Sequence, residues 1–231
     1  SDQPFVSKHH PGAVVTLSIE PTIEFNERSG MATSTRRKAI EIWGNKLPPD
    51  DPEKVAKMLF CCDNPPGSPY ISGSQDSIGI VYSGLVRSYY EGDYWPATIE
   101  HHVDGACLDF VESGLYLKPL GPRGATYDVL SDTRIDEANA GELAEAADWC
   151  WRSLLARDLK GLGVAMRRSF EAQIAMFPHM TSPDIMELIN SYQDQVLGWK
   201  LAGAGGGGYL VMASEQPIPD TLQILARRPL G

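Results

Sequence analysis

Residues 198–212 read GWKLAGAGGGGYLVM, and five glycines occupy the six positions 203–208. Glycine loses more backbone entropy on folding than any other residue, so such a run is retained where side chains would obstruct a close approach of the main chain. The apolar residues on either side predict two strands that hold the loop rigid. A flexible linker is the alternative, but linkers usually have polar, structureless flanks. We therefore expect a strand–loop–strand unit whose loop lies against a ligand, another loop or a phosphate.

Composition limits the classes of partner. The chain has 231 residues, of which 42% are hydrophobic, which is enough for a substantial core in one large domain or two lobes. Its formal net charge is −10, and such a surface repels nucleic acid and anionic membranes. The basic cluster Arg36–Lys38 is too short for a nucleic-acid footprint, and no apolar run approaches the ~20 residues that span a bilayer. We expect neither nucleic acid nor membrane as a partner.

Cysteine and histidine patterns indicate no metal centre. The four cysteines show no C-x-x-C spacing, so neither a zinc site nor a disulfide framework is predicted. A reducing, cytoplasmic setting is the simplest interpretation. Two histidine pairs lack carboxylate or cysteine partners at ligand spacing, and we interpret them as surface or hydrogen-bonded residues. These positions are Cys61, Cys62, Cys107 and Cys150, with His9-His10 and His101-His102.

The N-terminal half predicts a strand and several helices. Residues 13–19 alternate in polarity and are rich in β-branched side chains, which is typical of a strand. Asp51, Pro52 and Glu53 form a helix start, with a capping carboxylate, a proline at the first position and an acid in the first turn. We also expect helices over 36–43 and from Ile78 to Val86, a strand over 114–120, and an apolar stripe of Val55, Met58, Leu59 and Cys62 on the helix that Asp51 begins.

The C-terminal half is strongly helical before the glycine-rich loop. Apolar residues recur there at intervals of three and four, the helical period. The three stripes are Leu143, Ala147, Cys150 and Leu154; Met166, Phe170, Ile174 and Phe177; and Ile185, Leu188, Ile189, Tyr192 and Val196. The third stripe begins at Ser182-Pro183-Asp184, a helix start, and residues 217–228 are expected to close the chain as a short helix. Helices mixed with hairpin-like strands predict an α+β architecture.

Two further segments of small residues precede helices. Residues 29–35 carry hydroxyls and N–H groups that can receive an anion at a helix N-terminus, although a serine or threonine cap is the alternative. Residues 73–76 place Asp76 directly after a glycine turn, where it can act as a general base on a hydroxyl or orient a cation. A helix cap is again the alternative. Neither segment is a P-loop, because no G-x-x-x-x-G-K-[ST] occurs.

Taken in this order, the three segments resemble the GHMP kinase superfamily, which includes galactokinase and the homoserine, mevalonate and phosphomevalonate kinases. Residues 198–208 resemble its third, glycine-rich motif. Residues 73–76 resemble the loop that carries its catalytic aspartate, most like the kinases of heptose or fucose. Residues 29–35 resemble its phosphate-binding motif, but Ala32 replaces an expected glycine and Arg36 stands where small residues are usual. Residues 1–5 resemble the tail of the first, sugar-binding motif.

The resemblance implies an α+β, two-lobed fold. A mixed α/β lobe would cover residues 1–112, and a ferredoxin-like and helical lobe would cover residues 113–231. Relatives carry a first strand before the position of Ser1, and strands and adenine-contacting segments where only a few residues separate Phe25 from Gly30 here. We expect that these segments are absent from the sequence shown rather than lost from the natural protein, because ATP binding needs an adenine pocket.

The resemblance also implies roles for individual residues. Asp76 takes or orients the proton of the attacking hydroxyl, and Lys8 is a candidate for its basic partner. The implied ATP contacts are Gly30, Thr33, Ser34, Thr35, Gly203, Gly205, Gly206 and Gly207, with Ser34 also helping to hold Mg²⁺. The implied substrate contacts are Asp2, Gln75 and Gly206.

The function implied is ATP-dependent phosphorylation of a small sugar, at its anomeric hydroxyl. One alternative is a GHMP kinase of the mevalonate or homoserine type. The other is a degenerate member that binds sugar or nucleotide without catalysis, which Ala32 and Arg36 motivate. The sequence does not indicate the oligomeric state.

Overall fold

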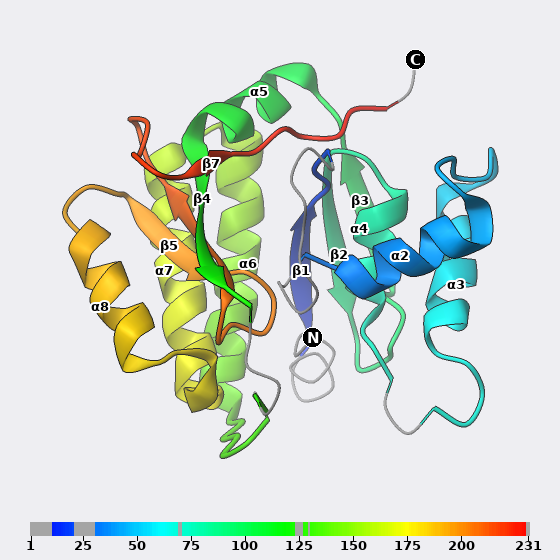
Figure 1. Ribbon diagram of the computed structural model, residues 1–231, viewed down its shortest axis with the longest axis horizontal. Helices are drawn as coiled ribbons and strands as arrows, with labels where there is room; N and C mark the ends of the chain where they lie inside the picture. Colours follow the sequence, from blue (N-terminus) through cyan, green and yellow to red (C-terminus); the bar gives the residue numbers. More distant parts are fainter. Residues whose placement is uncertain (1–10, 21–30, 69–70, 123–126, 129, 230–231) are drawn as a thin grey trace.

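The computed structural model describes residues 11–20, 31–68, 71–122, 127–128 and 130–229. Two predicted site residues, Asp2 and Gly30, lie outside these ranges, as does Lys8. Within them, two antiparallel sheets are packed with helices (Figure 1). Among the described residues, no helix is long and apolar enough to cross a membrane.

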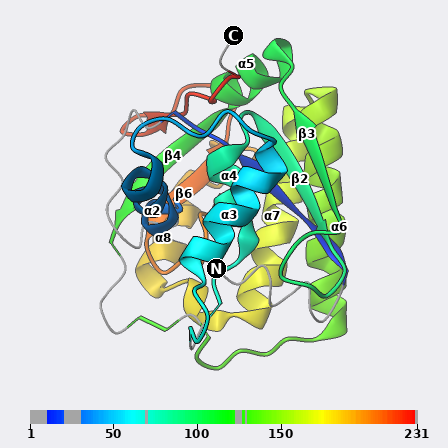
Figure 2. The same cartoon turned by 90° about the vertical axis from the view of Figure 1, so that its right-hand side faces the viewer.

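The first sheet has the strand order β1-β2-β3. Strand β1 (Gly12–Leu17) pairs antiparallel with β2 (Leu85–Tyr90), which pairs antiparallel with β3 (Thr98–His102). The strand predicted over 13–19 is therefore confirmed for most of its length. The helices α2 (Thr33–Trp43), α3 (Pro52–Asp63) and α4 (Ser74–Val81) stack beside this sheet (Figure 2).

Two expectations in this half are wrong. The helix expected to run through Val86 ends at Val81, because Gly84 turns the chain with φ +66° and Leu85 then pairs with Leu17 and His102. A Cβ on Gly84 would lie 2.6 Å from the His102 carbonyl oxygen, so only glycine fits this turn.

The apolar stripe on α3 is shifted as well. Val55, Ala56 and Leu59 are buried, whereas Met58 is 46% exposed and Cys62 is exposed. The buried face is the one that contacts α4. The spacing of apolar residues in the sequence did not decide which face of α3 is buried, and packing against α4 did.

The second sheet has the order β5-β6-β4-β7. Strands β5 (Gly198–Leu201) and β6 (Gly208–Ala213) flank the glycine-rich loop, which confirms the predicted strand–loop–strand unit. Strand β4 (Leu115–Gly121) pairs with β6 and follows directly on α5 (Gly105–Gly114). The three helical stripes become α6 (Glu137–Ala156), α7 (Leu159–Met176) and α8 (Pro183–Tyr192), and a 3₁₀ turn, η1 (Pro178–Met180), follows α7. Helix α6 also packs on β1, so it joins the two halves.

The helix expected over 217–228 does not form. This segment is extended: β7 (Leu222–Gln223) pairs with β4, and Ala226 forms a bridge with Ile19 beyond the end of β1. The Arg227 N–H donates to the Ser18 carbonyl, and the Gly84 N–H donates to the Arg227 carbonyl. Main-chain partners from both sheets therefore outweigh the local preference for a helix.

The architecture confirms the predicted α+β class. The predicted boundary between the two lobes, at residues 112 and 113, lies close to the junction of α5 and β4. The division into lobes stays a prediction.

Helix starts fall into two groups. Side chains of Asp51, Asp104, Asp136, Asp158 and Ser182 cap α3, α5, α6, α7 and α8 by accepting a hydrogen bond from a first-turn N–H. In contrast, neither α2, which begins after Ala32, nor α4, which begins after Gly73, has a side-chain cap in the described part of the chain. Both starts lie at the cavity described next.

Candidate active site

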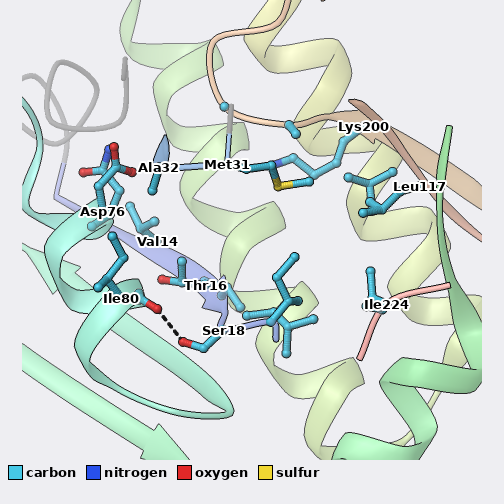
Figure 3. A pocket seen from close by; sticks show the side chains of 18 of the residues that line it. Val14, Thr16, Ser18, Met31, Ala32, Asp76, Ile80, Leu117, Lys200 and Ile224 are labelled. Carbon is cyan, nitrogen blue, oxygen red and sulfur yellow. Dashed lines mark hydrogen bonds between the residues drawn. The ribbon is translucent and has the colours of Figure 1, made fainter. Parts of the chain in front are cut away.

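A cavity of about 320 Å³ lies between the first sheet, the start of α2 and the second sheet (Figure 3). Most of its lining is apolar, and a few polar side chains point into it, which is the usual character of a small-molecule site. Its apolar lining includes Val14, Leu17, Met31, Ile80, Leu115, Leu117, Val211 and Ile224, and its polar lining includes Thr16, Ser18, Arg36, Gln75, Asp76 and Lys200.

Asp76 stands in the first turn of α4 and is half-buried at this cavity. The start of α4 is fixed by the buried Ser74, whose Oγ lies 2.9 Å from the Tyr90 hydroxyl and donates to the Tyr94 carbonyl over 2.5 Å. Gln75, predicted as a substrate contact, also lines the cavity and is 5% exposed. Asp76 and Gln75 therefore both lie at this cavity, and their roles stay predictions.

The start of α2 enters the cavity with its backbone. Ala32 lines the cavity and has φ 52° and ψ 34°, the left-handed conformation, which explains why a glycine is expected at this position. The predicted contacts Thr33, Ser34 and Thr35 form the first turn behind it and are not among the cavity-lining side chains. The Thr35 hydroxyl is buried and donates to the Asp63 carboxylate of α3, and Ser34 is exposed.

The glycine-rich loop reaches the cavity at its first residues. Ala202 and Gly203 line the cavity, but Gly205, Gly206 and Gly207 do not. The Gly206 N–H donates to the Met180 carbonyl over 2.7 Å, and a Cβ on Gly205 would lie 2.5 Å from that same oxygen. A Cβ on Gly206 would overlap the ring of Tyr127, whose hydroxyl donates to the Ala204 carbonyl. Close packing against protein therefore explains these two glycines.

Two cations at the cavity were missed as site residues by the sequence reasoning. Lys200 comes from β5, opposite Val211, and Figure 3 shows its side chain directed into the cavity. Its Nζ lies 3.5 Å from the Ser169 hydroxyl, and burial lowers the pKa of its amine. Arg36 lies one turn below Ala32 on α2, and burial likewise lowers the pKa of its guanidinium. The sequence did offer one signal for them: Arg36 directly follows residues 29–35, and Lys200 lies just before the glycines at 203–208.

The buried atoms Thr16 Oγ1 and Arg36 Nε belong to the lining and have no hydrogen-bond partner among the described residues. A buried polar group without a partner costs about 1–3 kcal/mol, so native structures usually supply one. A polar ligand in the cavity would satisfy both atoms.

The site thus combines a carboxylate, two helix starts without side-chain caps, a glycine backbone and two cations in one cavity. Helix N-termini attract anions because several N–H groups there lack an intrahelical partner. The carboxylate can accept a proton, and the cations can hold negative charge. The arrangement suits the transfer of an anionic group to a hydroxyl.

Comparison with solved structures identifies the fold. The chain superposes on mevalonate kinase of L. major, solved with R-mevalonate, with a TM-score of 0.60 and 12% identity over 97% of this chain and 92% of that one. It also matches a putative sugar kinase from Campylobacter jejuni (TM-score 0.56, 14% identity, 87% of this chain) and galactokinase of Lactococcus lactis, solved with galactose (TM-score 0.56, 15% identity, 83% of this chain). These matches confirm the predicted GHMP-kinase-like fold.

The chain spans 62% of the Campylobacter kinase and 60% of the galactokinase. No protein-family model and no curated protein matches the sequence.

Proposed function

We propose that this protein is a small-molecule kinase that transfers the γ-phosphoryl group of ATP to a hydroxyl of its substrate. The observation that carries the proposal is the convergence of Asp76, Ala32 and Gly203 on one cavity, although they come from segments far apart in the sequence. The fold, shared with sugar and mevalonate kinases, supports the same reaction class.

In this proposal Asp76 accepts the proton of the acceptor hydroxyl. The acceptor oxygen forms a bond to the γ-phosphorus, the bond from that phosphorus to the bridging oxygen breaks, and ADP leaves with the electron pair. The reaction needs positioning and charge stabilisation more than covalent participation of the protein. A carboxylate fixed at a helix start by Ser74 and Tyr90 provides such positioning.

The residues present fit the phosphates of ATP. The first-turn N–H groups of α2 and α4 are not claimed by a side-chain cap, and the backbone at Ala32 and Gly203 can approach a ligand closely. We assign the phosphates to these groups rather than to Gly206, whose N–H is already donated to Met180. Thr33, Ser34, Gly205 and Gly207 remain predicted contacts, and the Thr35 side chain acts by anchoring α2 to α3.

Mg²⁺ would neutralise phosphate charge in this reaction. Among the described residues, no group of three or more His, Cys, Asp or Glu side chains could hold a metal ion. That fits a magnesium ion bound by substrate phosphates with one or two protein oxygens. Ser34 stays a predicted ligand, and Asp76 is the carboxylate at the cavity that could assist it.

A sugar is the first candidate acceptor, phosphorylated at its anomeric hydroxyl, because the motif around Asp76 resembles that of sugar kinases. A mevalonate-type alcohol is the second candidate. It is favoured by the lining itself, in which aliphatic side chains such as Leu117, Val211 and Ile224 outnumber polar ones. Sugar-binding sites usually have more hydrogen-bonding side chains than this cavity lining.

The test is turnover by the full chain. Purified protein is incubated with ATP, Mg²⁺ and a panel of sugars, mevalonate and homoserine, and ADP release is measured. We expect Asp76→Asn to lower kcat by about 10²–10⁴-fold, because the amide cannot accept the proton. Asp93→Asn, at an exposed loop carboxylate, is the matched control and should retain activity.

Undiminished turnover by Asp76→Asn would remove Asp76 from the mechanism. Binding of a sugar without any ATP affinity would instead support the catalytically degenerate alternative. Circular dichroism of both variants checks that the fold is retained.

A further inference from the structure

The first sheet ends in an open edge at β3. Its strand order is β1-β2-β3, and among the described residues no further strand pairs with β3. The sheet lies between α4 and α6, which occupy its two faces (Figure 1). Main-chain N–H and C=O groups along an open edge can pair with another strand, and proteins usually protect such edges with lysine, proline or a covering segment. Strand β3 contains neither lysine nor proline.

The hydrogen bonds to β2 decide which main-chain groups of β3 point outward. The Tyr89 carbonyl of β2 accepts from the Ala97 N–H, so it points towards β3, and its register partner is Thr98. The groups that bond to a given neighbour alternate along an antiparallel strand. The even-numbered residues of β3 therefore bond to β2, whereas the odd-numbered ones, Ile99 and His101, direct their N–H and C=O groups away from the sheet.

The side chains of β3 are divided between the two helical layers. Ile99 packs in an apolar cluster with side chains of α3 and α4. On the opposite face, the ring of His102 lies 6.5 Å from the ring of Trp151 on α6. The Glu100 carboxylate lies on this face as well, 2.6 Å from the Arg87 guanidinium. Glu100 and His102 are thus neighbours on one face, directly beside the open edge.

Exposed apolar side chains lie at the C-terminal end of this edge. Val103 directly follows β3 and is 38% exposed, and Leu155 on α6 is 42% exposed. Leu155 comes four residues after Trp151, so the two side chains lie on the same side of α6. A strand that paired with β3 as far as Val103 would cover part of this apolar surface.

The charges of β3 exclude most ways of pairing it with a second copy of itself. Odd-numbered residues can pair only with odd-numbered ones, so a two-fold axis must pass through a residue. An axis at Glu100 would place two carboxylates directly opposite each other, and an axis at His102 would place Glu100 opposite Asp104. An axis at Ile99 would pair His101 and His102 with residues that precede β3.

An axis at His101 gives a complementary arrangement. It places Glu100 opposite His102 of the second copy, and Ile99 opposite Val103 of the second copy. The Glu100–His102 pair occupies a position without main-chain hydrogen bonds between the two strands, where facing side chains approach most closely. An imidazole N–H can donate to a carboxylate whether or not the ring is charged. By symmetry, each favourable pair occurs twice.

We propose that β3 pairs antiparallel with β3 of a second copy, about a two-fold axis at His101, so that two three-stranded sheets join into one sheet of six strands. Strand β1, which contributes to the cavity lining, lies at the other edge of each sheet, away from β3. The interface therefore leaves both cavities outside it. This inference concerns an interaction surface and does not rest on the proposed kinase function.

The first experiment measures association of the full chain by sedimentation velocity, at concentrations up to about 1 mM. The net charge of −10 opposes self-association, so the buffer contains about 0.15 M salt, which screens charges beyond about 8 Å. We expect the mass to rise from that of one chain to that of two. His102→Glu should weaken the dimer about tenfold, because it sets two pairs of carboxylates opposite each other.

Two further variants separate a lost pair from a damaged fold. Asn45→Glu adds the same charge at an exposed position after α2 and should associate like the wild type. Adding Glu100→Lys to His102→Glu places a lysine opposite each new glutamate and should restore the dimer, while Arg87 keeps Asp148 as its partner. A second substitution would not repair a damaged fold, and circular dichroism checks all variants.

The second experiment locates the interface by amide hydrogen exchange of the wild-type chain. The N–H groups of Ile99 and His101 should exchange at least tenfold more slowly where the dimer prevails than after dilution. The N–H groups of Thr98 and Glu100, which bond to β2, should not respond to dilution. Because this comparison uses the wild type, it decides the question even if a variant does not fold.

Three results would overturn the inference. The first is a monomer at every concentration. The second is a dimer that His102→Glu leaves intact. The third is a dimer in which the Ile99 and His101 amides exchange at the same rate before and after dilution, which would assign the association to another surface. None of these results bears on the proposed kinase function, which ADP release tests separately.

Discussion

The glycine-rich loop and the starts of α2 and α4 look alike in sequence, since each is a short run of small residues, but the structure uses them differently. At Gly205 and Gly206 the missing side chains make room for Met180 and Tyr127, and the Gly206 N–H is donated inside the protein. At Ala32 and Gly73 the helix starts lack side-chain caps. The first arrangement holds the loop against the protein, whereas at the second no side-chain cap takes the first-turn N–H groups. A run of small residues alone therefore does not identify a ligand contact.

The largest effect should come from adding a side chain to the tightly packed part of the glycine-rich loop. Gly206→Ala adds a Cβ against the Tyr127 ring at a residue with φ +67°. We expect the free energy of unfolding to fall by about 3 kcal/mol, from about 1–2 kcal/mol of backbone strain and a similar crowding cost. Gly92→Ala is the control, because Gly92 has φ +95° but nothing within 4 Å of an added Cβ, so only the strain should appear. Equal losses in urea denaturation would show that crowding by Tyr127 contributes nothing.

The next effect is a loss of stability at alkaline pH, and it concerns Tyr90, which contacts Ser74 at the start of α4. Burial raises the pKa of Tyr90, the partner of Ser74, to about 12. The unfolded chain releases this proton near pH 10, so the folded state binds more protons between pH 10 and 12, and stability falls as pH rises through that window. The loss should reach about 2–3 kcal/mol at the upper end.

Tyr90→Phe should weaken this alkaline decline without abolishing it, because burial also raises the pKa of Tyr82 to about 12. The variant should cost about 1 kcal/mol at neutral pH for the lost hydrogen bond. Tyr89→Phe should retain the decline. Urea midpoints measured at several pH values test both, and an unchanged decline in Tyr90→Phe would assign it to another group.

A moderate effect on the free energy of unfolding should distinguish a helix with a side-chain cap from one without. The Asp158 carboxylate accepts from the Gly161 N–H over 2.9 Å at the start of α7, so Asp158→Ala should lower the free energy of unfolding by about 1 kcal/mol. Ser34→Ala, in the first turn of α2, should change it by less than about 0.5 kcal/mol because Ser34 is exposed and caps nothing. A large loss in Ser34→Ala would mean that α2 has a side-chain cap after all.

The smallest effect should be a gain. Ala32 holds a left-handed conformation that costs a side-chain-bearing residue about 1–2 kcal/mol. Ala32→Gly removes that strain, but the more flexible unfolded chain offsets about 0.4–1 kcal/mol. We expect a net stabilisation of about 0.5 kcal/mol. Ala138→Gly, in the right-handed first turn of α6, should destabilise instead, and a loss in both variants would show that Ala32 is unstrained.

Much of the candidate site could be predicted because its signals are local. Asp76 and Gln75 follow a glycine turn, and the strand–loop–strand unit is marked by composition alone. The cations could not be predicted in the same way. Whether Arg36 faces solvent or a cavity depends on what packs against α2, which lies far from the helix in sequence. The C-terminal segment that carries Arg227 is likewise positioned by hydrogen bonds to Ser18 and Glu20, which follow β1.

By itself, the sequence determined where most elements begin and what they are. Caps such as Asp51 and Ser182, and helical periods such as that of α8, act within a few residues, so local physics is sufficient. Only the tertiary structure decided that Leu85 starts a strand, that residues 222–223 form a strand, and that Asp76 and Arg36 share a cavity. These outcomes depend on partners distant in sequence, whose main-chain hydrogen bonds and burial outweigh the preferences of any single segment.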